Sequence, residues 1–204
     1  MNIGILGTGS VGRTLATALA GAGHRVQMGT RDPEATLART EPDRFGTPAL
    51  SSWVSEHGDV RLVDFAQAAA GADLVINATA GDVSLQALQA AGSDNLRGKV
   101  LIDVSNPLDF SAGFPPTLFV KETDSLGEQI QRTFPETMVV KSLNTMNAGL
   151  MLDPGRLSAP SAWMALTRPA IELSIGIIAR SASSLSVAEK TSSNDAQAMA
   201  SISG

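Results

Sequence analysis

The chain has 204 residues, 43% of them hydrophobic, and a formal net charge of −5, which fits one well-buried domain and excludes a generally basic surface for nucleic acid or anionic lipid. It contains no cysteine, which excludes disulfides, thiolate catalysis and cysteine metal sites. The first predicted strand begins at once and leaves no room for a signal peptide, and apolar runs stay far below the ~18 residues of a membrane span. We therefore expect a cytoplasmic protein.

The first 31 residues have the pattern of a dinucleotide-binding βαβ unit. Apolar residues 2–6 predict a strand buried on both faces, and residues 25–29 predict the next parallel strand. Apolar residues at helical spacing between Val11 and Ala22 predict the connecting helix. The turn before this helix has the pattern G-x-G-x-x-G, a strong signal in this context, and consists of Gly7, Thr8, Gly9, Ser10, Val11 and Gly12.

Each glycine of this turn has an expected role. Gly7 makes the tight turn, Gly9 lets backbone N–H groups approach a pyrophosphate, and Gly12 lets the helix pack close to its strand. The helix N-terminus adds unpaired N–H groups and a partial positive charge. The alternative is a glycine-rich turn that only tightens the fold.

The end of the second strand indicates which dinucleotide binds. NAD-preferring sites place an acidic residue about twenty positions after the glycines, where it bonds the ribose hydroxyls. Here Thr30 and Arg31 occupy that place, and a hydroxyl with a guanidinium can bind a 2′-phosphate that a carboxylate would repel. Asp32, which precedes Pro33, is interpreted as a helix N-cap. We predict NADP(H) as the cofactor.

Strands and helices alternate through the rest of residues 1–154. Further strands are predicted at residues 60–63, 73–78, 99–104 and 137–143, and helices at 33–40, 65–70, 83–91 and 124–134. Residues 41–58 and 111–117 are predicted to be mainly surface loop. This alternation predicts an α/β fold with a Rossmann-type doubly wound parallel sheet, and makes residues 1–154 an NADP-binding domain. Residues 155–204 form a short, atypical C-terminal segment, with one predicted helix and a disordered tail from Ser192.

Polar residues end three of the predicted strands at the edge where an open parallel sheet binds its ligands. Their amides and hydroxyls could meet the nicotinamide and its ribose, or could instead satisfy backbone groups at the strand ends. With their neighbours, the candidates are Asn77, Ala78, Thr79, Asn106, Pro107 and Asn144. None of these side chains is a strong acid or base.

No residue is assigned as catalytic, because the usual acid–base groups are missing or misplaced. The chain has no tyrosine, and His24 and His57 are interpreted as surface residues away from the site. Lys141 lies within the last predicted strand and could reach the site. No acidic or histidine cluster has the spacing of metal ligands. Such a site suits two cofactors held face to face, with the protein orienting them.

Five motifs resemble those of NADPH-dependent reductases of the deazaflavin coenzyme F420: residues 7–12, 29–33, 77–79, 103–109 and 141–147. The resemblance covers about residues 1–154. It implies an NADP-dependent oxidoreductase that exchanges a hydride directly between the nicotinamide and coenzyme F420, without a protein acid or base. It also implies that residues 8–11 hold the pyrophosphate, that Thr30 and Arg31 hold the 2′-phosphate, and that the strand-end loops wall the nicotinamide.

The chain departs from this family at two places. Members often carry a further basic residue shortly after the arginine, where this chain has Ala35. Members also continue with a strand and helices that help form the second cofactor's pocket and a dimer, which residues 158–204 do not resemble. A frameshifted or divergent C-terminus is one hypothesis for this difference. A homodimer, another acceptor (a flavin, a metal chelate, a small carbonyl or imine) and a non-catalytic NADP(H)-binding protein remain open alternatives.

Overall fold

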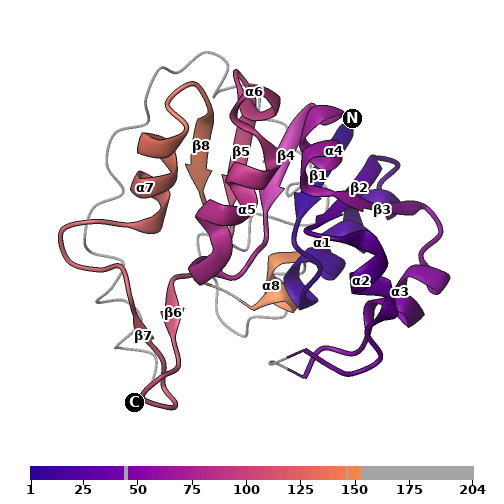
Figure 1. Ribbon diagram of the computed structural model, residues 1–204, viewed down its shortest axis with the longest axis horizontal. Helices are drawn as coiled ribbons and strands as arrows, with labels where there is room; N and C mark the ends of the chain where they lie inside the picture. The colour runs from indigo at the N-terminus through magenta and orange to yellow at the C-terminus, as the bar shows by residue number, and fades with distance from the viewer. Residues whose placement is uncertain (44–45, 146, 153–204) are drawn as a thin grey trace.

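A parallel sheet forms the centre of the computed structural model, which describes residues 1–43, 46–145 and 147–152 (Figure 1). The strand order is β3-β2-β1-β4-β5-β8, and every pairing is parallel. This is the order of a doubly wound dinucleotide-binding fold, whose switch point lies between β1 and β4. It confirms the predicted fold class. The strands are β1 (Asn2–Leu6), β2 (Arg25–Thr30), β3 (Val60–Asp64), β4 (Leu74–Asn77), β5 (Val100–Asp103) and β8 (Met138–Lys141).

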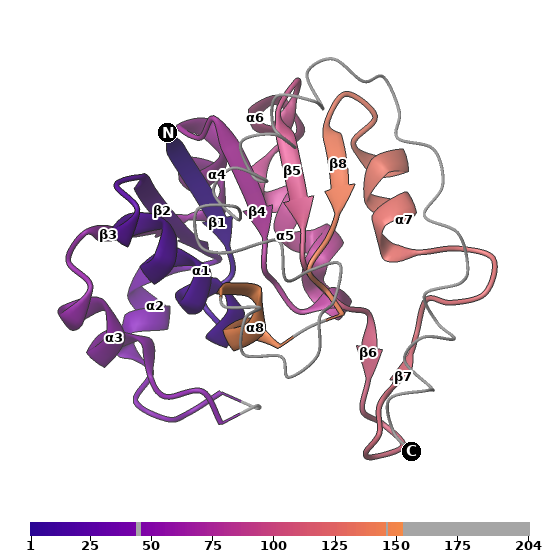
Figure 2. The ribbon, with the colours of Figure 1, turned by 180° about the vertical axis from the view of Figure 1, so that it is seen from behind.

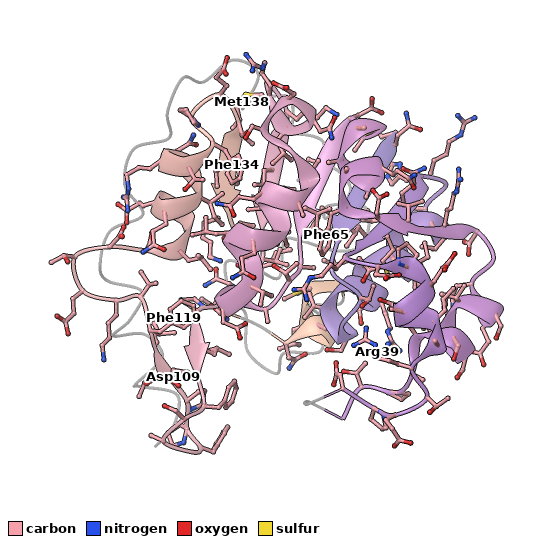
Figure 3. The ribbon with its side chains drawn as sticks, viewed as in Figure 1. Arg39, Phe65, Asp109, Phe119, Phe134 and Met138 are labelled. Atoms are coloured by element: carbon pink, nitrogen blue, oxygen red, sulfur yellow. The ribbon has the colours of Figure 1, made fainter. Side chains whose placement is uncertain are left out.

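Helices cover both faces of the sheet (Figures 1 and 2). One face packs against α1 (Ser10–Gly21), α3 (Leu50–Glu56) and α8 (Ala148–Leu152). The other face packs against α4 (Phe65–Ala70), α5 (Ser84–Ala91), α6 (Ser93–Leu96) and α7 (Leu126–Thr133). Figure 3 shows Phe134 just beyond α7, and this side chain is buried in the second cluster. The two apolar clusters explain why the strand residues are apolar on both faces. The remaining helices are α2 (Pro33–Ala38) and the 3₁₀ turn η1 (Gly81–Val83).

The cap predicted at Asp32 forms as expected, and two further helices are capped in the same way. The Asp32 carboxylate accepts a hydrogen bond from the Ala35 backbone N–H at 2.9 Å, and so caps α2. Asp64 caps α4, and the Ser125 hydroxyl accepts from the first turn of α7. These caps depend on contacts three residues apart, which is why the sequence alone predicts them.

One predicted loop contains a helix, and the other joins two short strands that were not predicted. Residues 41–58 include α3, whose Leu50 is buried and whose Trp53 packs against the cluster beneath α1. The second loop connects β6 (Leu108–Asp109) and β7 (Thr117–Leu118), which pair as an antiparallel hairpin. This hairpin projects away from the sheet (Figure 2), and Figure 3 labels Asp109, the last residue of β6, and Phe119, which follows β7. Elements this short carry too few residues for a periodic pattern, so sequence patterning misses them.

The C-terminal predictions lie outside the described residues. These are the helix of residues 171–185, the tail from Ser192, the domain division after residue 154 and the hypothesis of a frameshifted segment. Among the helices that the structure does describe, none combines the length and the apolar character that crossing a membrane requires.

Candidate dinucleotide-binding site

Two of the three motif glycines are required by the protein's own packing. Gly7 has φ +115°, and a Cβ there would lie 2.5 Å from the carbonyl oxygen of Ala78 at the end of β4. A Cβ on Gly12 would lie 2.3 Å from the carbonyl oxygen of Gly7, so α1 packs directly on the turn. At Gly7 and Gly12 the neighbouring backbone therefore leaves no room for a side chain, as the motif predicts.

Gly9 is different, because nothing in the protein requires a glycine there. Its φ of −73° suits any residue, and a Cβ built on it meets no heavy atom within 4 Å. Gly9 is also the N-cap of α1, which has no side-chain cap and no acidic residue in its first turn. An open approach to uncapped N–H groups at the start of a helix fits a pyrophosphate. The residues present therefore suit the dinucleotide that the sequence predicts.

Arg13, which the sequence motifs do not single out, holds this turn against its surroundings. Its Nε donates to the carbonyl oxygen of Thr8 at 2.9 Å, and its Nη1 donates to that of Ala49 at 3.5 Å. Burial lowers the pKa of this guanidinium, while the negative charge of Asp43 opposes the shift. Its position in the sequence, one turn into a helix that begins at a predicted phosphate-binding loop, could have identified Arg13 as part of this site. Arg13 thus fixes the loop and adds positive charge beside it.

The end of β2 differs in detail from the prediction. Thr30 is buried, with 7% of its surface exposed, and its hydroxyl lies 2.9 Å from the hydroxyl of Thr36 in α2. Arg31 is exposed, and among the described residues it has no carboxylate partner. The Thr36 hydroxyl also accepts a hydrogen bond from Arg39 Nη2 at 3.3 Å. Arg31 is thus the accessible charge of the predicted pair, whereas Thr30 lies beneath the surface.

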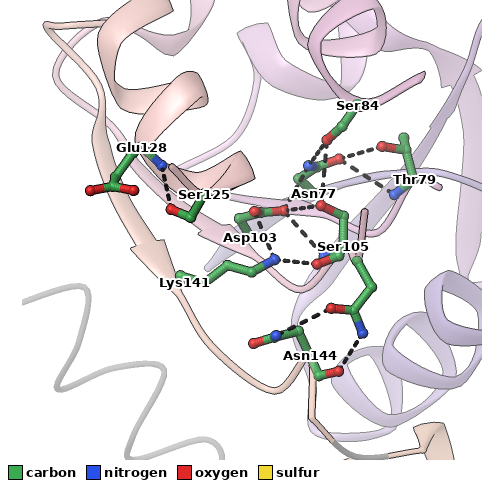
Figure 4. Close-up of polar contacts among 10 residues, drawn as sticks. Asn77, Thr79, Ser84, Asp103, Ser105, Ser125, Glu128, Lys141 and Asn144 are labelled. Carbon is green, nitrogen blue, oxygen red and sulfur yellow. Dashed lines mark hydrogen bonds and ion pairs between the residues drawn. The ribbon is translucent and has the colours of Figure 1, made fainter. Parts of the chain in front are cut away.

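Asn77 lies at the centre of a buried polar network at the ends of β4 and β5 (Figure 4). Its amide nitrogen donates to Ser84 Oγ at 2.5 Å and to Asp103 Oδ1 at 2.8 Å, and its oxygen accepts from the Thr79 hydroxyl at 2.7 Å. Asn77 is completely buried. Its amide was expected to be available to a ligand, but the structure uses every group of it internally. Thr79 is half-buried and less enclosed than Asn77, to which its hydroxyl donates.

Asp103 and Lys141 form an ion pair that no sequence pattern predicts. Lys141 Nζ lies 2.9 Å from Asp103 Oδ2, and it also donates to the carbonyl oxygen of Ser105. Asp103 is completely buried, and its Oδ1 accepts from Asn77 and from both the backbone and the hydroxyl of Ser105. Burial lowers the pKa of Lys141, and the Asp103 charge partly offsets that shift. The pair therefore ties β8 to β5 at the edge that holds the site.

Asn106 and Asn144 join the loop after β5 to the loop after β8. Asn106 donates to the carbonyl oxygen of Asn144 at 2.5 Å, and Asn144 donates back to the Asn106 side chain at 3.2 Å. A Cβ on Gly81 would lie 2.2 Å from the carbonyl oxygen of Asn106, so η1 packs against this loop too. The three predicted strand ends are thus brought together, which confirms that part of the prediction. Their contact with a cofactor stays a prediction.

The two histidines lie away from this edge. His24 precedes β2 and His57 precedes β3, at the opposite ends of those strands, and His57 stacks on Trp53 with ring centroids 4.2 Å apart. Across the part of the chain that the structure describes, no group of three or more His, Cys, Asp or Glu residues could hold a metal ion.

The sheet order, the glycine turn and the convergent strand ends define a Rossmann-type dinucleotide-binding protein. The sequence model of one family, described as NADP oxidoreductase, coenzyme F420-dependent, matches residues 2–107. The chain belongs to this family, whose members are oxidoreductases that use NADP(H) and coenzyme F420.

Individual relatives agree with this assignment. A crystal structure of a candidate F420-dependent NADP reductase from Arthrobacter sp. FB24 is 53% identical, with a TM-score of 0.74 over 89% of this chain and 80% of that one. The F420-dependent NADP reductase of Methanothermobacter marburgensis is 32% identical over 162 residues, which are 75% of this chain and 67% of that protein. The metalloreductase STEAP3 of Rattus norvegicus is 30% identical over 146 residues, 72% of this chain. This chain spans only 25% of the length of the rat protein.

Proposed function

We propose that this chain binds NADP(H) and transfers a hydride between the nicotinamide and coenzyme F420. One observation carries the proposal. At Gly9 the protein leaves open space over the uncapped start of α1, beside the switch point of the sheet, in a chain of the F420-dependent NADP oxidoreductase family. The backbone of residues 8–11 holds the pyrophosphate, and Arg31 holds the 2′-phosphate. Ala78, Thr79, Asn106, Pro107 and Asn144 wall the nicotinamide.

The protein's part in the reaction is to bind and orient. When bound, the nicotinamide and the deazaflavin supply the hydride donor and acceptor themselves. The strongest acid–base pair near the site, Asp103 with Lys141, is engaged in holding two loops together. The Asn106–Asn144 pair fixes the wall of the nicotinamide site and helps to exclude water from it. No side chain needs to move a proton in this proposal.

The similarity to a metalloreductase favours one second candidate function. The rat protein matches 72% of this chain at 30% identity. A reductase that passes NADPH electrons to a flavin or a metal chelate would use the same nucleotide site. A screen of NADPH oxidation with F420, FMN and a ferric chelate separates the two candidates. Turnover only with F420 supports the first proposal, and turnover only with the others replaces it.

We also propose that the chain works as a cytoplasmic homodimer. Large apolar side chains are exposed together on the β6–β7 hairpin, including Phe114, which is 90% exposed, with Leu118 and Phe119. Exposed apolar surface of this kind suits an interface. Light scattering should report twice the chain mass of 21.1 kDa. A monomer at micromolar concentration would contradict the proposal.

The cofactor assignment predicts that Arg31→Ala weakens NADPH binding by about 1–3 kcal/mol, the range for hydrogen bonds to charged groups, with much less effect on NADH. Calorimetric titration of both nucleotides measures the difference. Arg25→Ala is the matched control, because Arg25 is an exposed arginine at the amino end of the same strand. Equal losses for NADPH and NADH would show that Arg31 does not bind the 2′-phosphate.

A further inference from the structure

We propose that Arg39 is a second ligand of the NADP 2′-phosphate and sets the preference for NADP(H) over NAD(H) together with Arg31. This inference rests on the proposed function, because it requires the nucleotide to bind with its adenosine ribose at the end of β2. It assigns a phosphate contact to a residue that lies eight positions beyond Arg31 in the sequence.

The first support is a chain of three polar side chains that leads from β2 to Arg39. Thr30 ends β2, and its hydroxyl lies 2.9 Å from that of Thr36, which lies 3.3 Å from Arg39 Nη2. Both threonines are buried, at 7% and 4% exposure. The guanidinium is therefore held by the buried hydroxyl that contacts the end of β2. Figure 3 shows Arg39 on the side of the molecule where the strands end.

The path of the chain explains how a distant residue returns to this point. Asp32 caps α2 and so begins the helix directly after β2. α2 ends at Ala38, and Arg39 is its C-cap residue with an extended backbone, φ −72° and ψ 128°. One short helix thus places a guanidinium at each of its ends, with Arg31 before it and Arg39 after it. A phosphate at the end of β2 can accept from both.

The second support is the unspent charge of Arg39. Its partner Thr36 is a neutral hydroxyl, and among the described residues no carboxylate lies within 4.0 Å of the Arg39 guanidinium. Arg97 and Arg132, by contrast, each contact a carboxylate at 2.7 Å. A guanidinium has five donors, and Thr36 uses one of them. The others suit the oxygens of a dianionic phosphate, which binds arginine through paired hydrogen bonds.

A structural role for Arg39 makes a different prediction. A cation at the C-terminus of α2 would stabilise that short helix, and its loss would lower the unfolding midpoint without regard to the nucleotide. A phosphate ligand instead changes the ratio of NADPH to NADH affinity. The fragment 2′,5′-ADP carries the same 2′-phosphate without the nicotinamide, and NADH lacks that phosphate, so a loss seen with the fragment and not with NADH reports on the 2′-phosphate contact.

The test is titration of the full chain with NADPH, NADH and 2′,5′-ADP, together with urea unfolding of each variant. Arg39→Ala should weaken NADPH and 2′,5′-ADP about tenfold, the loss of one hydrogen bond to a charged group, and leave NADH within about twofold. Arg39→Lys, which keeps the charge but not the planar fork, should lie between. Thr36→Val removes the hydroxyl that holds Arg39 and should weaken NADPH less than Arg39→Ala does. Arg25→Ala is the control and should change none of the three.

The outcomes separate this inference from the proposal beneath it. A wild-type chain that prefers NADPH, with an unchanged preference in Arg39→Ala, overturns the role of Arg39 and leaves the cofactor assignment standing. Equal losses for NADPH and NADH overturn it in the same way. A wild-type chain without preference for NADPH over NADH overturns both.

Discussion

Replacing Gly9 with alanine should weaken NADPH binding by about 2 kcal/mol or more, roughly thirtyfold, while the free energy of unfolding stays within about 1 kcal/mol of wild type. The new methyl group meets no protein atom within 4 Å, and the backbone at φ −73° accepts alanine. It does occupy the space through which a pyrophosphate would reach the N–H groups of α1. Gly9→Ala should therefore weaken NADPH binding without a comparable loss of stability.

Gly12→Ala is the contrasting variant. Its methyl group would lie 2.3 Å from the carbonyl oxygen of Gly7, so α1 and the turn must move apart. We expect a loss of about 1–3 kcal/mol in the free energy of unfolding, together with weaker NADPH binding. Gly21→Ala lies at the other end of the same helix, where the added methyl group meets no atom within 4 Å. This variant should bind NADPH as wild type does, and its free energy of unfolding should change by less than about 1 kcal/mol.

Urea unfolding of the free protein and NADPH titration of each variant measure both effects. If Gly9→Ala binds NADPH as wild type does, the pyrophosphate does not lie over the start of α1, and the proposed function loses its main support.

Lys141→Met should lower the free energy of unfolding by about 3 kcal/mol, the cost of leaving a buried charge without its partner. Asp103 is completely buried. Lys141 donates a hydrogen bond to Asp103 Oδ2, whereas Asn77 and Ser105 donate to Asp103 Oδ1. The variant also removes the contact of β8 with the Ser105 carbonyl in the loop after β5, so NADPH binding should weaken. Lys121→Met, the same substitution at an exposed lysine, should stay within about 0.5 kcal/mol of wild type.

The pH dependence gives this variant a second readout. Burial lowers the pKa of Lys141 below its ordinary value of 10.5, with Asp103 opposing. The folded state therefore releases this proton at a lower pH than the unfolded state does. Because the unfolded chain holds more protons in that window, the Lys141 contribution to stability rises as the pH climbs toward 10.5.

Urea unfolding at several pH values below 10.5 should show this rise in wild type and a flatter profile in Lys141→Met. An unfolding free energy unchanged by Lys141→Met would mean that the Asp103 carboxylate does not depend on this ion pair.

The sequence by itself determined the features that depend on near neighbours. The bounds of β1, the alternation of strands and helices, and the caps at Asp32 and Asp64 all follow from residues a few positions apart. The glycine turn belongs to this group in part, since Gly12 is required by a contact with the nearby Gly7, whereas the contact that requires Gly7 is with Ala78 at the end of β4. Fold class and cofactor class were therefore predictable from the sequence.

Only the tertiary structure decided which polar groups remain available to a ligand. Asn77 and Thr30 were expected to be available to a ligand, but both are buried. The amide of Asn77 donates a hydrogen bond to Asp103, and the hydroxyl of Thr30 is hydrogen-bonded to that of Thr36. The contacts of Asp103 with Asn77 and Lys141 join residues 26 and 38 positions apart, so they exist only once the strands take their order in the sheet. The contact of Thr36, which holds Arg39, with Thr30 likewise forms only because α2 turns the chain back toward β2. Burial and pairing are properties of the whole packing, and no local pattern encodes them.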